Sequence, residues 1–272
     1  MIHSLHLYDD LDRELIQLLK SLKKEDWDKH TLAPKWSVKD IASHMLDTTL
    51  RGISTSRDGH FGEAPPQING YSDLEAFLNQ LNADWVKATK RLSPELLILL
   101  LETMLPILSS HMKSLDLEAK ALFSVDWAGE ELSKNWFHCA REYTEKYHHQ
   151  MQIRAAVGKE EVLLAEKWYL PYLDTSMQAL PHHYRDIVAE EGSSIKFSIA
   201  EISKNWVLSF RNKSWVLEDE AEAFASEVII PGKIAWKLFT KGISADKARN
   251  QIHISGDQRL GEHILKLIAV IA

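Results

Sequence analysis

The chain contains one cysteine, Cys139, among its 272 residues. An internal disulfide needs two cysteines, so a disulfide framework is excluded and a reducing cytoplasm is favoured. Cations are also scarce, because 32 lysines and arginines face 39 aspartates and glutamates, for a net charge of −7. Non-specific binding to nucleic acid or to an anionic membrane needs an excess of lysine and arginine. We therefore expect neither partner.

The sequence also lacks an uninterrupted apolar run of the roughly 18–20 residues that span a bilayer. Its longest apolar run, residues 96–108, is broken by Glu102 and Pro106, and we interpret it as a buried helix. The first residues carry Asp9, Asp10 and Asp12 instead of the basic-then-apolar order of a signal peptide. These features predict a soluble cytoplasmic protein.

Helical periodicity dominates the first part of the chain. Ser37 and Asp40 form a capping-box pattern at a helix start, and Ser93-Pro94 is typical of another. Residues 59–70 are rich in glycine and proline and predict a loop, as do residues 126–135. The expected helices cover residues 8–24, 37–57, about 72–91, from 93 onward, and about 133–157. The pattern predicts a four-helix bundle domain over residues 1–160.

The pattern changes in the second part. Short segments with alternating apolar residues predict strands near residues 195–202, 205–212, 214–219 and 225–231, with a further short strand at 251–255. Helical segments are predicted before these strands, at 232–242 and at 257–271. Strands combined with helices indicate a small α+β domain over residues 168–272. The fold class expected for the whole chain is therefore α+β with two domains.

A narrow polar stripe runs along the helix predicted at 133–157. At about 100° per residue, the stripe covers less than a quarter of the helix circumference. Burying so many polar groups costs several kcal/mol unless a metal ion or other partners satisfy them. Its members are His138, Arg141, Glu145, His149 and Gln152.

The helix at 37–57 carries a second polar stripe, made of Asp40, His44, Asp47, Thr48 and Arg51. If the two helices are neighbours, His44 can join Glu145 and His149 in a set of two histidines and one carboxylate. Three protein ligands with open positions are typical of catalytic zinc, and also suit nickel, iron or manganese.

Alternatives to a metal centre remain open from the residues alone. Glu145 and His149 are also spaced as an ordinary i,i+4 surface pair, and the two stripes can form a polar packing network without metal. His148 lies about 100° from His149 on the helix, so it is interpreted as a flanking group, although the two histidines could exchange roles.

Two motifs carry a resemblance to a known family. The stretch W-S-V-K-D-I-A-S-H-M at 36–45, together with R-E-Y-T-E-K-Y-H-H-Q-M-Q-I-R at 141–154, resembles the DinB/YfiT-like superfamily. It is most similar to the mycothiol-dependent maleylpyruvate isomerase branch. The C-terminal part, with "WKLFTKG" and "SGDQRLGEHIL", resembles the sterol-carrier-like domain appended in that branch.

The resemblance implies a divalent metal held by His44, Glu145 and His149, with Gln152 where the family often has aspartate. It also implies a low-molecular-weight thiol as co-reactant and thiol-dependent isomerase or transferase chemistry. The family's activity uses a C-terminal arginine that faces the metal. No equivalent aligns here, and the candidates are Arg211, Arg249 and Arg259.

Other polar residues have two interpretations each. Arg141 and Arg154 can bind a substrate carboxylate, or pair with acids such as Glu142 or Asp47. His182-His183 can contribute to a second metal site, but a solvated helix start is favoured.

The remaining candidate functional residues are expected to lie in the hydrophobic cores. Cys139 is expected to be a core residue rather than a nucleophile. Trp206, Trp215 and Trp236 are expected in the second core, although they could line a hydrophobic ligand groove. The competing functional hypothesis is therefore a non-enzymatic, metal-stabilised binding module.

Overall fold

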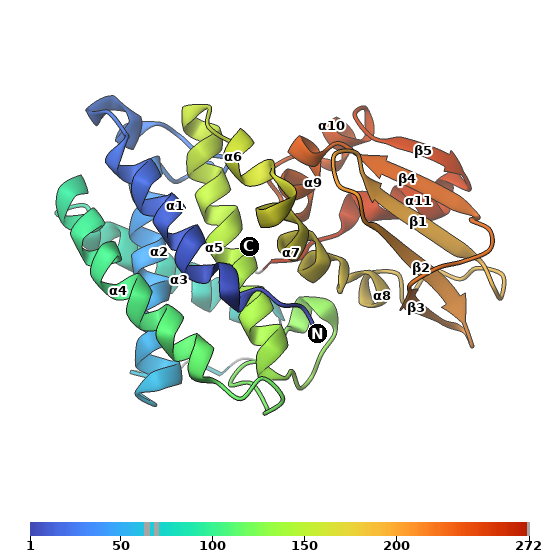
Figure 1. Ribbon diagram of the computed structural model, residues 1–272, viewed down its shortest axis with the longest axis horizontal. Helices are drawn as coiled ribbons and strands as arrows, with labels where there is room; N and C mark the ends of the chain where they lie inside the picture. The colour runs from blue at the N-terminus through green and yellow to red at the C-terminus, as the bar shows by residue number, and fades with distance from the viewer. Residues whose placement is uncertain (63–65, 68–70, 271–272) are drawn as a thin grey trace.

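The computed structural model describes residues 1–62, 66–67 and 71–270. A helical N-terminal region lies beside a C-terminal domain built on a sheet (Figure 1), so the predicted α+β fold class is confirmed. Within the predicted loop at 59–70, residues 59–62 form no helix or strand. Residues 63–65 and 68–70 of that loop lie outside the described residues.

Four long helices form the bundle and a fifth packs on its side. In the bundle, α1 and α2 each contact both α4 and α5, and α3 packs against α2. Short 3₁₀ turns (η1 Leu5–Leu7, η2 Lys24–Asp28, η4 Asp126–Ala128) and one π turn (η3 Ile53–Arg57) flank them. The long helices are α1 (Tyr8–Lys20), α2 (Val38–Gly52), α3 (Tyr71–Thr89), α4 (Pro94–Ser114) and α5 (Asn135–Val157).

The helix ends follow the local signals in the sequence. Ser37 caps α2 by accepting a hydrogen bond from the Asp40 amide, and Asp40 reciprocates as the capping box predicts. Ser93 caps α4, and Pro94 occupies its first turn. Gly158 ends α5 at φ 70°, a left-handed conformation that glycine adopts without a steric penalty.

Contacts between the helices define their directions. Asp12 contacts Lys146 and Glu14 contacts Arg154, so α1 and α5 run parallel. Asp9 contacts Lys113 and Lys20 contacts Glu102, so α4 runs antiparallel to α1. Gly52 lies near Leu108, and Ser56 near His111, so α2 runs parallel to α4. It follows that α2 and α5 are antiparallel neighbours.

Five strands form one mixed sheet in the order β3-β2-β1-β4-β5. Neighbouring strands are antiparallel except β1 and β4, whose parallel register aligns Phe197 with Val228. The alternating side chains Ile195, Phe197 and Ile199 are fully buried on one face. The strands are β1 (Ser194–Ile199), β2 (Asn205–Arg211), β3 (Ser214–Glu218), β4 (Ser226–Ile230) and β5 (His253–Gly256).

Short helices α6 to α8 connect the bundle to the sheet, α9 and α10 lie between β4 and β5, and α11 follows β5. Their bounds are α6 (Glu161–Leu164), α7 (Glu166–Met177), α8 (Leu180–His183), α9 (Gly232–Phe239), α10 (Ala245–Arg249) and α11 (Gln258–Glu262), with a 3₁₀ turn η5 (His263–Lys266). α7 packs along α5, whereas α8 and α11 pack against the sheet. One hydrophobic cluster therefore runs from α5 through α7 into the sheet. The division into a domain ending at residue 160 and a domain starting at residue 168 therefore stays a prediction.

Two sequence expectations were wrong in detail. The apolar run 96–108 lies in α4, but only one side of that helix is buried, and Leu99 is 58% exposed. Among the described helices, α4 alone is long and apolar enough to cross a membrane, a test that core helices also pass. The expected helix at 257–271 is also shorter, because η5 ends at Lys266 and the chain then runs along α9, where the Ala269 amide donates to the Phe239 carbonyl. Leu267, Ala269 and Val270 are buried there, whereas Ile268 is 38% exposed.

Candidate metal centre

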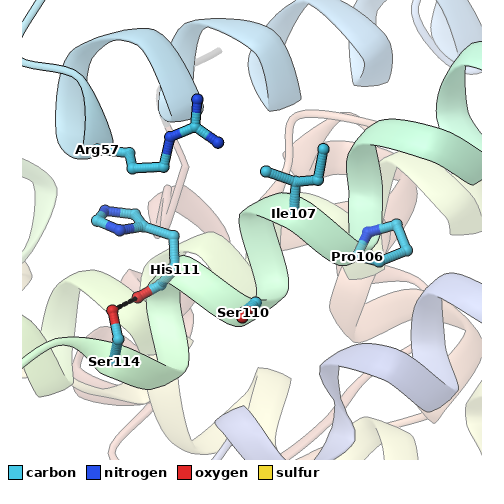
Figure 2. Close-up of a pocket in the computed structure, with 6 residues that line it drawn as sticks. All are labelled: Arg57, Pro106, Ile107, Ser110, His111 and Ser114. Carbon is cyan, nitrogen blue, oxygen red and sulfur yellow. Dashed lines mark hydrogen bonds between the residues drawn. The ribbon is translucent and has the colours of Figure 1, made fainter.

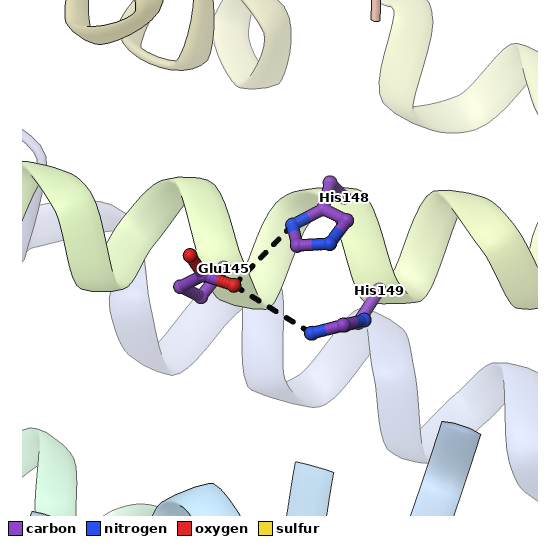
Figure 3. Close-up of side chains that lie close together, drawn as sticks. All are labelled: Glu145, His148 and His149. Atoms are coloured by element: carbon purple, nitrogen blue, oxygen red, sulfur yellow. Dashed lines mark ion pairs between the residues drawn. The ribbon is translucent and has the colours of Figure 1, made fainter. Parts of the chain in front are cut away.

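Glu145 and His149 face each other one turn apart on α5. The Glu145 Oε2 atom lies 3.6 Å from His149 Nε2 (Figure 3). This separation is too long for a good hydrogen bond. Two ligands of one zinc ion, each about 2.0–2.2 Å from it, stand roughly 3.4 Å apart in tetrahedral geometry. The gap therefore has the size that a shared ion requires.

Gln152 orients the His149 ring. The Gln152 Oε1 atom lies 2.9 Å from His149 Nδ1. An amide oxygen only accepts hydrogen bonds, so Nδ1 carries the proton and Nε2 carries the lone pair, pointing at Glu145. Metal-binding histidines are typically held by such a second hydrogen bond. The stripe residue Gln152 thus selects the tautomer that a ligand needs.

His148 has a different environment although it adjoins His149. Its Nδ1 lies 3.6 Å from Glu145 Oε2 and 3.1 Å from the Thr144 carbonyl oxygen. Because a carbonyl can only accept, Nδ1 is protonated and cannot also bind a cation. Glu145, His148 and His149 are close enough to form a metal-binding group, the one such group among the described histidines, cysteines and acids. The bond to Thr144 argues against His148 as its third ligand.

α2 brings His44 beside His149, although His44 does not belong to the group of close ligand atoms formed by Glu145, His148 and His149. The His44 and His149 rings lie 4.7 Å apart between centroids, edge to face. His44 Nδ1 is buried and has no hydrogen-bond partner. The Trp36 ring, from the loop before α2, lies 4.8 Å from the His44 ring and covers it. His44 is therefore a buried imidazole with an unused nitrogen beside His149.

Burial controls the protonation of these groups. It lowers the pKa of His149 to about 3, with His148 adding to the effect, and it holds the pKa of His44 well below the ordinary value. Burial also raises the pKa of Glu145, although His149 opposes the shift. Neutral imidazoles are the form in which histidine binds metals. The side chain of Glu145 is still 25% exposed, so the cluster is open to small solutes.

Arg141 and Glu142 lie next to the cluster on α5. Arg141 Nη2 contacts Glu142 Oε1 at 2.7 Å and His138 Nδ1 at 2.9 Å. Burial alone would raise the pKa of Glu142, but Arg141 and His138 outweigh it and lower that pKa. Burial lowers the pKa of His138 to about 4. Arg141 is thus paired with Glu142, one of the two interpretations left open by the sequence.

Asp47 and Arg51 continue the site along α2. Because α2 and α5 are antiparallel and His44 meets His149, Arg51 lies near the level of Arg141. Arg51 Nη2 donates to Asn82 Oδ1 of α3 at 2.9 Å, and lies 3.0 Å from Asp47 Oδ2 at a poor hydrogen-bonding angle. Burial raises the pKa of Asp47 while Arg51 opposes the shift.

Unsatisfied polar atoms are concentrated here. Among the described residues, eight buried side-chain nitrogen or oxygen atoms have no hydrogen-bond partner, and four of them belong to this cluster. Buried polar atoms are normally satisfied, so such a concentration indicates a bound ion, water or ligand. The four atoms are His44 Nδ1, Asp47 Oδ2, Arg51 Nε and Arg141 Nε.

Other sequence candidates lie elsewhere. Arg154 is buried against α1, where it donates to Glu14 Oε2 at 2.9 Å and to Gln150. The three C-terminal arginines pair within their own domain: Arg211 with Glu218, Arg249 with Glu262, and Arg259 with Asp257.

The favoured interpretation of His182-His183 as a solvated helix start was wrong for His183. Its ring stacks on His263 at 4.3 Å, and each Nε2 lies within 3.0 Å of the other residue's carbonyl oxygen. The reason is that η5 packs beside α8, which the local sequence does not indicate.

Cys139 and the three tryptophans lie in the core. Cys139 is 2% exposed, and burial raises the pKa of its thiol to about 12. Trp206, Trp215 and Trp236 are each at most 5% exposed. These side chains pack among apolar neighbours, which gives no support to a ligand groove formed by the tryptophans.

Sequence reasoning overlooked two aromatic neighbours. Trp36 covers His44, and its position eight residues before that histidine was a usable signal. Tyr172 of α7 is fully buried close to Glu145. Burial raises the pKa of this tyrosine, and the charge of Glu145 raises it further. No local pattern predicts this contact, because α7 reaches α5 only through tertiary packing.

Comparisons with known proteins agree with this architecture. Among the solved structures that match, two are described as the mycothiol-dependent maleylpyruvate isomerase, one of them a histidine-to-alanine mutant. They share 12% and 10% identity with the chain, with TM-scores of 0.55 and 0.54. Each match covers 92% of this chain and 91% of the other. At this identity the likeness shows the fold alone.

A third solved structure, "UbiJ-SCP2 Ubiquinone synthesis protein", matches 40% of the chain and 88% of its own length, at 17% identity and a TM-score of 0.23. That score supports no conclusion, so the sterol-carrier-like description of the C-terminal domain stays a prediction. No curated protein matches the chain. The family model of the mycothiol maleylpyruvate isomerase N-terminal domain matches residues 8–153, more than half of the chain. The chain therefore belongs to the mycothiol maleylpyruvate isomerase N-terminal domain family.

Proposed function

We propose that this protein is a thiol-dependent isomerase whose site is built on a divalent ion bound by His44, Glu145 and His149. One observation carries the proposal: His149 Nε2, freed by the Gln152 bond, faces Glu145 at 3.6 Å beside the unpartnered imidazole of His44. A set of two histidines and one carboxylate suits zinc best, and nickel, iron or manganese also accept it.

The donor set fits an ion in its protonation states as well as its spacing. Burial keeps both imidazoles neutral at physiological pH. Burial also disfavours an unpaired Glu145 carboxylate, and a cation would offset that cost. When bound, such an ion lowers the pKa of a thiol or water in its open position. The proposed ion and the deprotonated side chains of His44, Glu145 and His149 would thus stabilise each other.

The thiol must come from outside the chain. Cys139 is the only cysteine, and its buried thiol, with a pKa of about 12, is not a nucleophile at neutral pH. The structural relatives are described as mycothiol-dependent. We infer that this protein also uses a low-molecular-weight thiol, which would enter at the exposed edge of Glu145.

The reaction follows from the nucleophile. A thiolate adds to a cis double bond conjugated to a carbonyl, and the former double bond becomes a single bond that can rotate. Expulsion of the thiolate then restores the double bond in the trans form, so the thiol is regenerated and atoms balance. If the thiol instead displaces a leaving group, the same site is an S-transferase.

Two arginines near the cluster can orient the substrate. Arg141 lies one turn before Glu145 on α5 and Arg51 lies on α2, and each has a buried Nε without an acceptor. Guanidinium groups bind carboxylates and enolates well. We therefore propose that these two arginines bind an anionic group of the substrate, whereas Arg154 supports the α1–α5 contact.

The test is a cis-to-trans isomerisation assay on a conjugated enone acid, with mycothiol or another thiol present or omitted. We expect turnover only with thiol and metal, and a loss of at least 100-fold in His44→Ala. His253→Ala, which removes an exposed histidine of β5, is the matched control and should retain activity. If the protein binds one metal ion per chain but shows no turnover with any thiol, the proposed isomerase activity is refuted and the proposed metal site is not.

A further inference from the structure

A pocket of about 490 Å³ lies between α4 and η3, and its basic side chains already have partners (Figure 2). Arg57 donates to Asp58 at 2.7 Å, and His111 lies 2.8 Å from the Ser56 hydroxyl oxygen. The buried nitrogens without partners lie instead along α2 and α5. Of these, the Nε atom of Arg51 has surroundings that suggest a further residue in the candidate site.

Arg51 lies on the same face of α2 as His44, two turns further along the helix. Its Nη2 atom donates to Asn82 Oδ1 of α3 at 2.9 Å and also lies 3.0 Å from Asp47 Oδ2. Its Nε atom is buried and has no partner among the described residues, although the side chain as a whole is 35% exposed. Arg51 is thus held at one nitrogen and leaves another for a ligand.

Asp47 and Asn82 compete for Arg51. Asp47 stands four residues before Arg51 on α2, a spacing at which opposite charges readily pair on a helix. An arginine and a carboxylate bind most strongly through two parallel hydrogen bonds. The observed pair lacks that geometry, because neither Asp47 Oδ2 nor Arg51 Nε makes a hydrogen bond. The bond to Asn82 accounts for the difference, since it draws Nη2 toward α3.

The shape of the guanidinium group extends this effect to Nε. The group is planar, and its five N–H donors have fixed directions. A bond that fixes Nη2 on α3 therefore also fixes the direction of Nε. As long as Asn82 holds Nη2, the group does not turn onto Asp47, and Nε stays available.

The bond between Asn82 and Arg51 is not needed to attach α3 to α2. Near the end of α3, Trp85 Nε1 donates to the Ser43 carbonyl at 2.8 Å, and the Thr89 hydroxyl bonds the Ser43 hydroxyl. These contacts fix α3 on α2 by themselves. The orientation of Arg51 is therefore the feature that depends on Asn82.

We propose that Asn82 is a positioning residue, which holds Arg51 away from Asp47 so that the guanidinium group can bind the anionic group of the substrate. The proposal rests on the function proposed above, in which Arg51 binds that group. It gives α3, which packs outside the four-helix bundle, a part in the site. Without the Asn82 oxygen, Arg51 should form both hydrogen bonds with Asp47 and bind an acid less well.

Titration calorimetry with trans-acetylacrylate, a small conjugated keto acid, and with its methyl ester tests this role on the zinc-supplemented full chain. Asn82→Leu should weaken binding of the acid by about 10- to 100-fold, as for a lost hydrogen bond to a charged group, and binding of the ester by less than about twofold. Asn82→Ala should give the same result, which excludes a clash of the leucine. Gln80→Leu is the matched control, because it removes an exposed amide of α3 that bonds Asp84, and it should bind both compounds as wild type does.

The double variant Asn82→Leu/Asp47→Asn separates positioning from a structural role. Asp47→Asn removes the charge that competes for Arg51, so the double variant should recover most of the lost affinity for the acid. A loss of α3 packing would not be recovered by this change. In the isomerase assay, the KM for the acid should follow the same pattern while kcat changes little.

The proposal is overturned if wild type binds the acid no better than the ester, or if Asn82→Leu leaves acid binding unchanged. A double variant that binds the acid as weakly as Asn82→Leu would also overturn it. If acid binding depends on Asn82 as expected but no thiol gives turnover, the proposed isomerase activity fails, whereas the positioning of Arg51 by Asn82 is supported.

Discussion

Single side chains select which histidine can bind a cation. His148 and His149 are adjacent and equally buried, yet His148 Nδ1 donates to the Thr144 carbonyl and His149 Nδ1 donates to Gln152. In His149 the bond to Gln152 leaves Nε2 free to point at Glu145. In His148 the bond to Thr144 occupies Nδ1, the nitrogen nearest Glu145. Two hydrogen bonds therefore separate the proposed ligand from its neighbour.

Gln152→Leu should weaken metal binding without unfolding the protein. The substitution keeps the side-chain size but removes the acceptor that fixes the His149 tautomer, an effect that typically costs 10–100-fold in metal affinity. Competition with a chromophoric chelator measures this loss. Gln150→Leu removes a nearby buried amide that bonds Arg154 and α1 instead, and it should lower stability more than affinity. Equal affinity in wild type and Gln152→Leu would contradict the assignment.

His183 should make stability depend on pH. Burial lowers its pKa from 6.5 to about 4, so between these values the unfolded chain binds a proton that the folded chain rejects. The contribution of His183 to the free energy of unfolding is fully present above about pH 6.5 and is lost as the pH drops toward 4. Allowing for partial exposure, we expect about 1–2 kcal/mol less free energy of unfolding at pH 5.0 than at pH 7.5.

Urea unfolding of His183→Gln checks this expectation. The variant should lose less stability between pH 7.5 and pH 5.0 than wild type does. His253→Gln, at an exposed position, should behave as wild type. A pH dependence in His183→Gln as steep as in wild type would show that other groups account for it.

At the scale of elements, one buried ion pair joins three bundle helices. Lys146 of α5 contacts Asp12 of α1 at 2.6 Å, and Ser109 of α4 donates to the same carboxylate at 3.1 Å. Asp12→Ala would leave the Lys146 charge unpaired and should cost about 3–5 kcal/mol. The double variant Asp12→Leu/Lys146→Met should be considerably more stable than Asp12→Ala.

Denaturation midpoints measure both effects. Arg13→Ala, which removes the exposed Arg13–Asp10 pair, is the control and should change stability by less than about 0.5 kcal/mol. A double variant no more stable than Asp12→Ala would mean that the pair itself, rather than relief of an unpaired charge, determines the stability.

The elements show how far local sequence predicts this structure. Capping signals at Ser37, Ser93 and Gly158 correctly locate helix ends, because caps depend on neighbouring residues. Hydrophobic periodicity fails for α4 and for the chain end. Leucines of α4 point outward as well as inward, and after η5 the non-helical residues Leu267, Ala269 and Val270 are buried in the core. In both places tertiary packing, which a local pattern does not contain, decides the outcome.

At the scale of the whole molecule, one of two hydrophobic clusters extends from the bundle into the sheet, and the other lies within the bundle. Tyr147 of α5 stacks on Tyr172 of α7 at 4.6 Å, and Tyr169 of α7 donates to the Gly232 carbonyl of α9 at 2.7 Å. Tyr172 also lies near enough to Glu145 for that carboxyl to help raise the pKa of the tyrosine. Long-range contacts of this kind explain why the motifs lead to the proposed ligands His44, Glu145 and His149 but not to their aromatic surroundings.

A fragment of residues 1–160 should be much less stable than the full chain. Without α7, the buried rings of Tyr143 and Tyr147 become exposed to water, at a cost of about 1.5–3 kcal/mol for each ring. Thermal unfolding followed by near- and far-UV circular dichroism should show one coincident transition for the full chain. Two separate transitions, with the fragment melting as the bundle does, would indicate independent domains.

The most direct measurement is an anomalous difference map from crystals of the untagged protein, recorded above and below the zinc absorption edge. The account predicts one strong peak, within about 2.0–2.2 Å of His44, Glu145 and His149. Absence of a peak after growth in zinc, nickel, iron or manganese would contradict a metal centre. A peak bound by His148 in place of His44 would contradict the proposed ligands.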